Sequence, residues 1–243
     1  MVTNALDHLR QDSELAVIAT VISTDPGTTA RMLRLVNSVA FAPRTPVTSV
    51  QQAAALLGRN QVEALLISIA AKRSLPSPVA IGFEEQRFWR TAAKRAILAG
   101  LVASLTEPTR KSENFSAALL QDMAIPVLAL RRDGYGDLLN HWHHSDDDLA
   151  ELEAGAFGWH HGTIGGQLAA SWNLPVALRE FMSEHHREPD QRFLAASSVA
   201  SIREVDAVGD EQFIVSASEW FDLETDLLVD FLAMAHDEAT AMA

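Results

Sequence analysis

Nine histidines occur in the chain, and four of them form two adjacent pairs, His160-His161 and His185-His186. Neutral imidazoles bind Zn, Fe, Ni and Mn, and a catalytic centre for such ions normally adds carboxylate ligands. The two pairs lie on separate predicted helices, so only the fold could bring them together. Adjacent histidines at helix ends also cap carbonyl groups or stay solvated. Residue type and spacing leave a metal site and a structural role both open.

A second polar group, His141-Trp-His-His144 followed by Asp146-Asp-Asp148, lies in a predicted loop. Its aspartates stand at the start of a helix, where the helix dipole favours negative charge, so we expect adventitious metal binding here at most. The chain has no cysteine, which excludes thiolate ligands, disulfides and cysteine nucleophiles and is compatible with a reducing cytoplasm. No Gly-rich phosphate loop, nucleophile elbow or paired-carboxylate motif is found.

Charge and hydropathy limit the kinds of partner. The 19 Lys and Arg residues and 32 Asp and Glu residues give a net charge of −13, which repels phosphate backbones and anionic lipid. The apolar runs are too short to span a bilayer, and residues 1–8 lack the features of a signal peptide. We therefore predict a cytoplasmic protein without nucleic-acid or membrane partners.

The elements that must position these side chains are predicted to be helices. Apolar residues recur at helical spacing from 28 to 39, a capped helix runs from Ser49 to Gly58, and another begins at Asn60. The prolines and serines between Arg73 and Gly82 predict a hinge. No strand-like alternation of useful length is present.

Three segments are expected from this pattern. Residues 1–75 form a small N-terminal helical lobe and residues 83–205 form a larger helical core. The acidic and apolar residues 206–243 form helices that cover the core or supply a dimer face.

A series of short motifs follows in a fixed order along the chain. The first motif consists of Leu33, Arg34, Asn37, Ser38 and Phe41, and the second of Ser49, Ala53, Leu57 and Gly58. Further segments follow in order: Phe88–Thr91, Ala117–Met123, His161–Gly165, Trp172–Pro175 and His185-His186. Together they resemble the HDOD family (HD-related output domain) of bacterial signalling proteins, over about residues 5–200. The resemblance implies an all-α fold, a multi-helix HDOD/HD-like bundle with a small N-terminal helical lobe.

Several metal-ligand positions of the related HD phosphohydrolases are occupied by other residues in this chain, and these differences affect whether it can bind a catalytic metal. Those enzymes hold their metal with a first histidine, a His-Asp pair and a later aspartate. Thr91 and Gln121 stand at the two histidine positions here, Asp122 remains, and residues 195–201 lack the last aspartate. A threonine and a glutamine cannot replace two imidazole ligands. The resemblance therefore implies a degenerate site without metal or cofactor, with vestigial positions Thr91, Gln121, Asp122, His161, His185 and His186.

The leading functional prediction is a non-enzymatic signal-transduction module that works through contacts with a signalling protein or a second copy of the chain. Arg34, Asn37 and Ser38 are candidate ligand- or partner-binding residues, because three polar side chains follow one another at the end of an apolar helix. The alternative is that Asn37 and Ser38 only close the helix and cap the loop.

Two other functions remain open. One is a metal-dependent phosphohydrolase with a rearranged site built from Asp122, His161, His185 and His186, with or without His160. The other is a nucleotide-binding sensor without catalysis.

Overall fold

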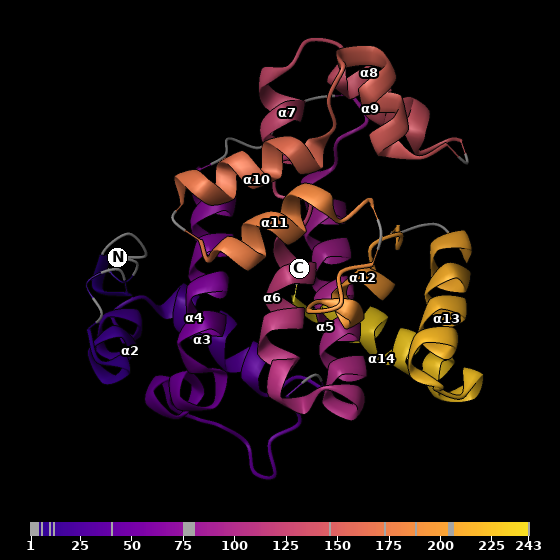
Figure 1. Cartoon of the computed structure of the whole chain (residues 1–243). Coiled ribbons are helices and arrows are strands. Elements are labelled where there is room, and N and C mark those ends of the chain that lie inside the picture. The colour runs from indigo at the N-terminus through magenta and orange to yellow at the C-terminus, as the bar shows by residue number, and fades with distance from the viewer. Residues whose placement is uncertain are drawn as a thin grey trace.

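Helices account for all the regular structure in the computed structural model (Figure 1), within the residues it describes. Those residues are 5, 7–9, 11, 13–39, 41–74, 81–145, 147–172, 174–187, 189–203 and 207–242. The all-α prediction is confirmed. No described helix is both long enough and apolar enough to cross a bilayer.

The N-terminal third of the chain contains helices α2 (Leu15–Ser23), α3 (Pro26–Val36) and α4 (Val50–Ser74). At the start of α3 the carboxylate of Asp25 accepts a hydrogen bond from the Thr28 backbone N–H at 2.8 Å, as expected of an N-cap. The two helices predicted around Gly58 are the two halves of α4, which meet at a kink, so the predicted interruption is confirmed. Gly58 has φ +75° and ψ 168°, a non-helical conformation that favours glycine and separates the two halves.

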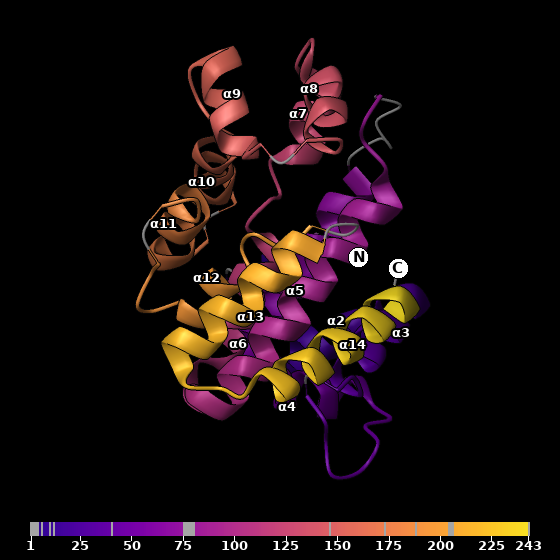
Figure 2. The same ribbon diagram turned by 90° about the vertical axis from the view of Figure 1, so that its right-hand side faces the viewer.

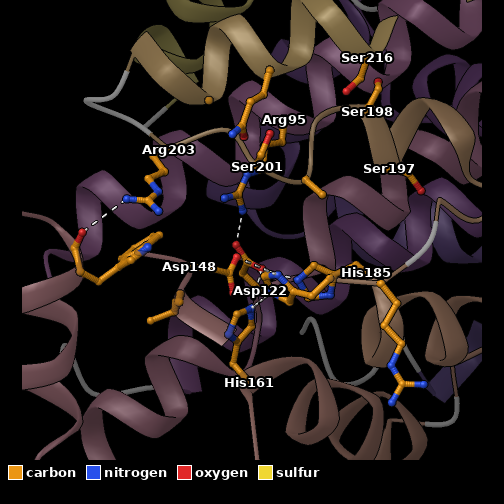
Figure 3. Close-up of a pocket in the computed structure, with 17 residues that line it drawn as sticks. Arg95, Asp122, Asp148, His161, His185, Ser197, Ser198, Ser201, Arg203 and Ser216 are labelled. Atoms are coloured by element: carbon orange, nitrogen blue, oxygen red, sulfur yellow. Dashed lines mark hydrogen bonds and ion pairs between the residues drawn. The ribbon is translucent and has the colours of Figure 1, made fainter. Parts of the chain in front are cut away.

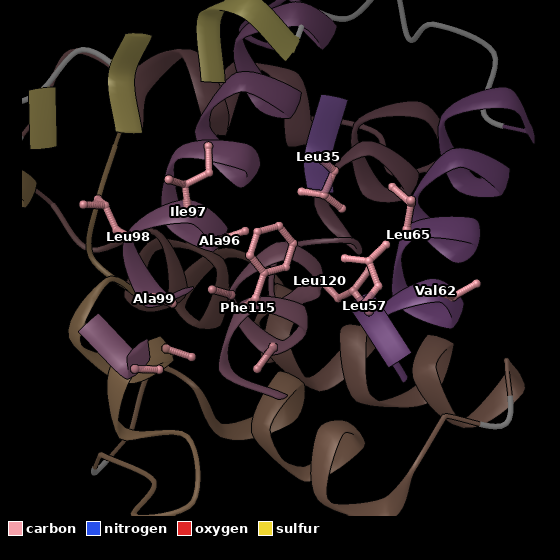
Figure 4. Packing of buried hydrophobic residues seen from close by; sticks show 14 of the residues in the cluster. Leu35, Leu57, Val62, Leu65, Ala96, Ile97, Leu98, Ala99, Phe115 and Leu120 are labelled. Carbon is pink, nitrogen blue, oxygen red and sulfur yellow. The ribbon is translucent and has the colours of Figure 1, made fainter. Parts of the chain in front are cut away.

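The centre of the molecule is the pair α5 (Glu85–Thr106) and α6 (Lys111–Leu120), joined by the short 3-10 turn Pro108–Arg110. Figure 4 shows Ile97 and Leu98 of α5 and Phe115 and Leu120 of α6 among side chains from the N-terminal helices. The last helix, α14 (Thr225–Met242), packs along α5 (Figure 2) and buries one apolar side. The main apolar cluster therefore draws residues from all three predicted segments.

Helices α7 (Ile125–Arg131), α8 (Tyr135–Trp142) and α9 (Leu149–Phe157) project from one end of the bundle, at the top of Figures 1 and 2. We call these three helices the cap. The cap has its own small apolar cluster, which includes Tyr135 and Leu139. Phe88 of α5 packs against both this cluster and the main core, so an apolar contact links the cap to the bundle.

Helices α10 (His161–Ser171) and α11 (Val176–Glu184) lie below the cap, followed by α12 (Leu194–Ser198) and α13 (Ala207–Phe221). Of the predicted hinge, residues 75–80 lie outside the described residues. At its end, Gly82 packs so tightly on α8 that an added Cβ would lie 2.5 Å from the backbone nitrogen of Asn140.

Candidate functional site

Asp122 lies at the centre of a buried polar cluster (Figure 3), in the turn that follows α6. Its Oδ2 forms an ion pair with the buried guanidinium of Arg95, while its Oδ1 lies 3.3 Å from His161 Nε2 and 3.1 Å from His185 Nε2. Burial opposes ionisation of this carboxyl. The charge of Arg95 and the rings of His161 and His185 outweigh burial and hold the pKa of Asp122 well below its usual range.

Three histidines converge on Asp122 from two helices. His161 is the first residue of α10, and His185 and His186 follow the end of α11. One ligand atom from each of the four residues can be chosen so that all lie within 4.8 Å of one another, and the two Nε2 atoms of His186 and His161 are 2.8 Å apart. The predicted separate pairs thus meet in the fold, although His160 is not part of this group.

Two glycines of α10 allow this convergence. A Cβ at Gly166 would lie 2.9 Å from the Cβ of Ser183, and one at Gly162 would lie 2.9 Å from the Ser183 carbonyl oxygen. At Gly165 an added Cβ would make only ordinary contacts of 3.6 Å or more. Gly162 and Gly166 therefore set the distance between α10 and α11.

Hydrogen bonds behind the cluster orient two of its rings. The buried carboxylate of Glu153 accepts from the backbone N–H of His161 at 2.6 Å, from its Nδ1 at 2.8 Å, and from the hydroxyl of Tyr135. Nδ1 of His185 donates to the carbonyl of Met182 at 3.0 Å. Because both acceptors lack a proton, they assign the Nδ1 proton and direct Nε2 of each ring toward Asp122.

The charge state of the cluster follows from these contacts. Burial disfavours an imidazolium, but hydrogen bonds to Asp122 and Glu153 raise the pKa of His161 to about 9. Burial and the neighbouring rings of His185 and His161 lower the pKa of His186. At neutral pH a protonated His161 therefore lies between two carboxylates, beside a neutral His186.

The donor set fits a transition-metal ion. Three imidazole nitrogens and one carboxylate oxygen are ligands that Zn, Fe or Mn accepts. Nε2 of His185 is buried and faces Asp122 Oδ1 at 3.1 Å, so an ion between them would find both ligand atoms already directed toward it. An ion held here would require His161 to give up its Nε2 proton. The absence of a metal stays a prediction.

The side chains at the two lost histidine positions donate to backbone carbonyls. The hydroxyl of Thr91 donates to the Arg87 carbonyl at 3.1 Å, and Nε2 of Gln121 donates to the Ala200 carbonyl at 3.4 Å. Neither side chain belongs to the four-residue group. Arg95, one helical turn beyond Thr91, instead supplies the positive charge beside Asp122.

The loop that follows α8 forms no comparable cluster within the described residues; Asp146 lies outside them. His141 Nε2 lies 2.9 Å from Asp147 Oδ2, and both side chains are more than half exposed. Nδ1 of His144 donates to the Asn140 carbonyl at 2.7 Å. Whether this loop binds a metal stays a prediction.

The candidate partner residues Arg34, Asn37 and Ser38 lie far from Asp122 in the sequence and outside its cluster. Arg34 is exposed, whereas Ser38 is buried and its hydroxyl has no hydrogen-bond partner among the described residues. The Asn37 side chain donates to the Leu33 and Val47 carbonyls and accepts from the Val47 N–H, each at 2.8 Å. Asn37 therefore closes α3 and fixes the loop that leads to α4.

Substitution of Asn37 by Ala is expected to lower the free energy of unfolding by about 1–2 kcal/mol, because three hydrogen bonds that hold the loop are lost. Urea unfolding measures this change, and Arg34→Ala serves as the control with little effect. An unchanged stability in Asn37→Ala would contradict the structural role and leave partner binding as the reason for this residue.

Solved structures share this fold. A protein of Shewanella amazonensis named as a candidate phosphohydrolase is 21% identical and has a TM-score of 0.70, with 100% of this chain and 93% of that chain covered. An HDOD domain protein of Geobacter sulfurreducens is 20% identical with a TM-score of 0.66, over 99% and 89% of the two chains. A candidate signal transduction protein of Marinobacter aquaeolei is 19% identical with a TM-score of 0.66, over 99% and 57%.

Sequence comparison gives the family directly. An uncharacterized protein of Treponema pallidum is 25% identical over 186 residues, which are 73% of this chain but only 34% of that protein. The chain thus spans about a third of the length of this relative. The family model of the HDOD domain matches residues 3–188, the stretch that includes Asp122, His161, His185 and His186. The chain therefore belongs to the HDOD domain family.

Proposed function

We propose that this protein is a non-catalytic regulatory module that acts through contacts with other proteins. The observation that carries the proposal is the ion pair of Arg95 with Asp122, at a site where Thr91 and Gln121 replace two metal-binding histidines of the HD phosphohydrolases. A fixed guanidinium supplies the charge that a metal would otherwise bring to this carboxylate. A guanidinium cannot generate a metal-bound hydroxide.

The number of remaining donors also favours a structural cluster. Catalytic zinc sites normally use three protein ligands and keep one position open for water, whereas structural sites are closed by four. Asp122 and the three histidines provide four donors. An ion held by them would supply a fixed positive charge joining α10 and α11 to the turn after α6.

Membership of the HDOD family supports the regulatory part of the proposal. The similar Marinobacter aquaeolei protein is named as a candidate signal transduction protein. The partner is a signalling protein or a second copy of the chain, and the net charge of −13 disfavours nucleic acid.

A rearranged metal-dependent phosphohydrolase is the second candidate function. The convergence of His161, His185 and His186 on Asp122 favours it, as does the similarity to the candidate phosphohydrolase of Shewanella amazonensis. The two proposals differ in whether this cluster turns over a phosphoester.

The deciding experiment measures bound metal and hydrolysis on one preparation of untagged protein expressed with Mn, Fe and Zn. The substrates are p-nitrophenyl phosphate, bis-p-nitrophenyl phosphate and a cyclic dinucleotide. We expect no metal-dependent turnover, with or without a bound ion. Turnover that disappears in both Asp122→Asn and His186→Ala, but persists in the exposed control His141→Ala, would establish the hydrolase and refute our proposal.

A further inference from the structure

A cavity of about 400 Å³ opens beside the Asp122 cluster, and Figure 3 shows the side chains that line it. Part of its lining is Trp142, Asp148 and Leu149 of the cap region. Another part comes from α12, the turn that follows it and α13. The width of the cavity therefore depends on how the cap is held to this C-terminal part of the chain.

The turn after α12, residues 199–203, is fixed to the bundle through its backbone, and we call it the strap. It lies beyond residue 188, where the family match ends. The buried guanidinium of Arg95 on α5 donates to the Ile202 carbonyl at 2.8 Å. The amide of Gln121, which directly follows α6, donates to the Ala200 carbonyl at 3.4 Å. The strap is thus bound to both central helices of the molecule.

Helix α13 packs on the same strap. An added Cβ at Gly209 would lie 2.6 Å from the Ser201 carbonyl oxygen, so the two backbones are close. Nζ of Lys94 on α5 donates to both carboxylate oxygens of Asp210 at 2.7 and 2.9 Å, which fixes α13 to the bundle. With contacts to α5 and to α13, the strap has little freedom to follow a movement of the cap.

Arg203, the last residue of the strap, reaches the cap. Its guanidinium donates to the backbone carbonyls of Trp142, Ser145 and Asp147 and lies 4.7 Å from the Trp142 ring centre. Trp142 is the last residue of α8, where unpaired carbonyls and the helix dipole favour a cation. The planar fork of an arginine can serve several such acceptors at once. Arg203 therefore ties the end of α8 and the approach to α9 to the strap.

The cap is also attached to the bundle through other groups. Phe88 of α5 packs on its apolar cluster, and Gly82 packs closely on the backbone of α8. Glu153 of α9 accepts hydrogen bonds from His161 of α10. These contacts involve α5, the residue Gly82 before it and α10, and not the strap. Loss of the Arg203 bonds would therefore leave the cap folded and attached.

We propose that Arg203 is a latch between the strap and the cap that limits access to the cavity, and that its release lets the cap move away from the strap. Such local opening breaks a few polar contacts while the apolar clusters of the cap and the bundle stay packed. A molecule that binds only the open form would shift the population toward it. This inference does not depend on whether the Asp122 cluster binds a metal or is catalytic.

The test is thiol labelling of the full chain with an aromatic disulfide reagent. The chain has no cysteine, so each variant carries a single introduced thiol. Leu149→Cys places it on the cap side of the cavity, at a residue that is 3% exposed. Leu101→Cys on α5, at a residue that is 7% exposed and packs in the main apolar cluster, reports opening of the bundle.

Both thiol variants are labelled with Arg203 intact, with Arg203→Met and with Arg187→Met. Arg187→Met is the matched control, because Arg187 also lines the cavity but is 71% exposed and pairs with Glu184 of α11. Circular dichroism and urea unfolding establish that each variant is folded.

We expect Arg203→Met to speed labelling at position 149 by about tenfold, because the closed form loses several hydrogen bonds from a charged donor. Labelling at position 101 should not change, and Arg187→Met should change neither rate. Hydrogen exchange should show faster exchange of the α8 amides in Arg203→Met.

Several results would overturn the latch. They are unchanged labelling at position 149 in Arg203→Met, or a thiol at that position that is already fully reactive with Arg203 intact. Equal acceleration at position 101 would mean that Arg203 stabilises the whole fold instead. Equal acceleration in Arg187→Met would attribute the effect to a shorter side chain at the cavity, and faster exchange confined to α13 would refute movement of the cap.

Discussion

Replacement of Arg95 by Met is expected to lower the free energy of unfolding by about 3–5 kcal/mol, because it leaves a buried carboxylate without its main counter-charge. Arg95 and Asp122 have side chains only 6% and 10% exposed, and Arg95 also donates to the Ile202 carbonyl at 2.8 Å. Water cannot replace the guanidinium in such a position. Denaturant unfolding of wild type and variant gives the difference directly.

The double variant Arg95→Met/Asp122→Asn tests the reason for this loss. Removal of the carboxylate charge should restore part of the lost stability, since an unsatisfied neutral amide costs less than a buried ion. Arg131→Met at the exposed end of α7 is the matched control and should change stability little. If Arg95→Met alone were as mild as this control, the ion pair would not carry the charge balance of the site.

Replacement of Glu153 by Gln is expected to destabilise the protein by about 2–4 kcal/mol. Glu153 is fully buried and accepts hydrogen bonds from three donors on two residues, His161 and Tyr135. Burial and the Glu153 charge raise the pKa of Tyr135 well above its usual range, so the phenol stays a donor. A glutamine would present N–H groups to some of these donors and would remove the charge that faces His161.

Glu151→Gln is the matched control, because Glu151 lies on the same helix and is exposed. Thermal and urea unfolding should give a clearly lower stability for Glu153→Gln than for Glu151→Gln, whose stability should be close to that of wild type. Similar stability of both variants would show that the buried carboxylate is replaceable and that Tyr135 and His161 find other acceptors.

The helical fold is readable from local sequence because its signals are local. The carboxylates of Asp25 and Asp148 cap α3 and α9 with N···O distances of 2.8 and 3.0 Å, a role typical of an aspartate just before a helix. Gly58 likewise interrupts the helix where the sequence predicts a stop, because its φ of +75° is unfavourable for residues other than glycine.

The site was predictable in part. The family pattern identifies Asp122, His161, His185 and His186, and the structure brings these four together. Arg95 was not singled out, although the pair Lys94-Arg95 in an otherwise apolar stretch of α5 was a usable signal. Buried cations need buried anions.

The identity of each counter-ion could not be read from the sequence. Arg95 and Asp122 are 27 residues apart, and Lys94 and Asp210 are 116 residues apart. Glu153 likewise resembles any other glutamate of an amphipathic helix until the rotation of α9 about its axis is known. Such pairings depend on how helices are rotated against one another, which hydrophobic periodicity does not specify to the accuracy of one side chain.

A series of polar contacts leads from Arg95 through Asp122, His161 and Glu153 to Tyr135, from the bundle into the cap. It runs beside the apolar contacts of Phe88 with both parts. Apolar contacts tolerate sliding, whereas ionic and hydrogen-bonded contacts hold for one orientation only. These directional contacts therefore fix the orientation of the cap relative to the bundle. A change in the charge of one of these five side chains would therefore alter the orientation of the cap more readily than the fold of the cap or the bundle.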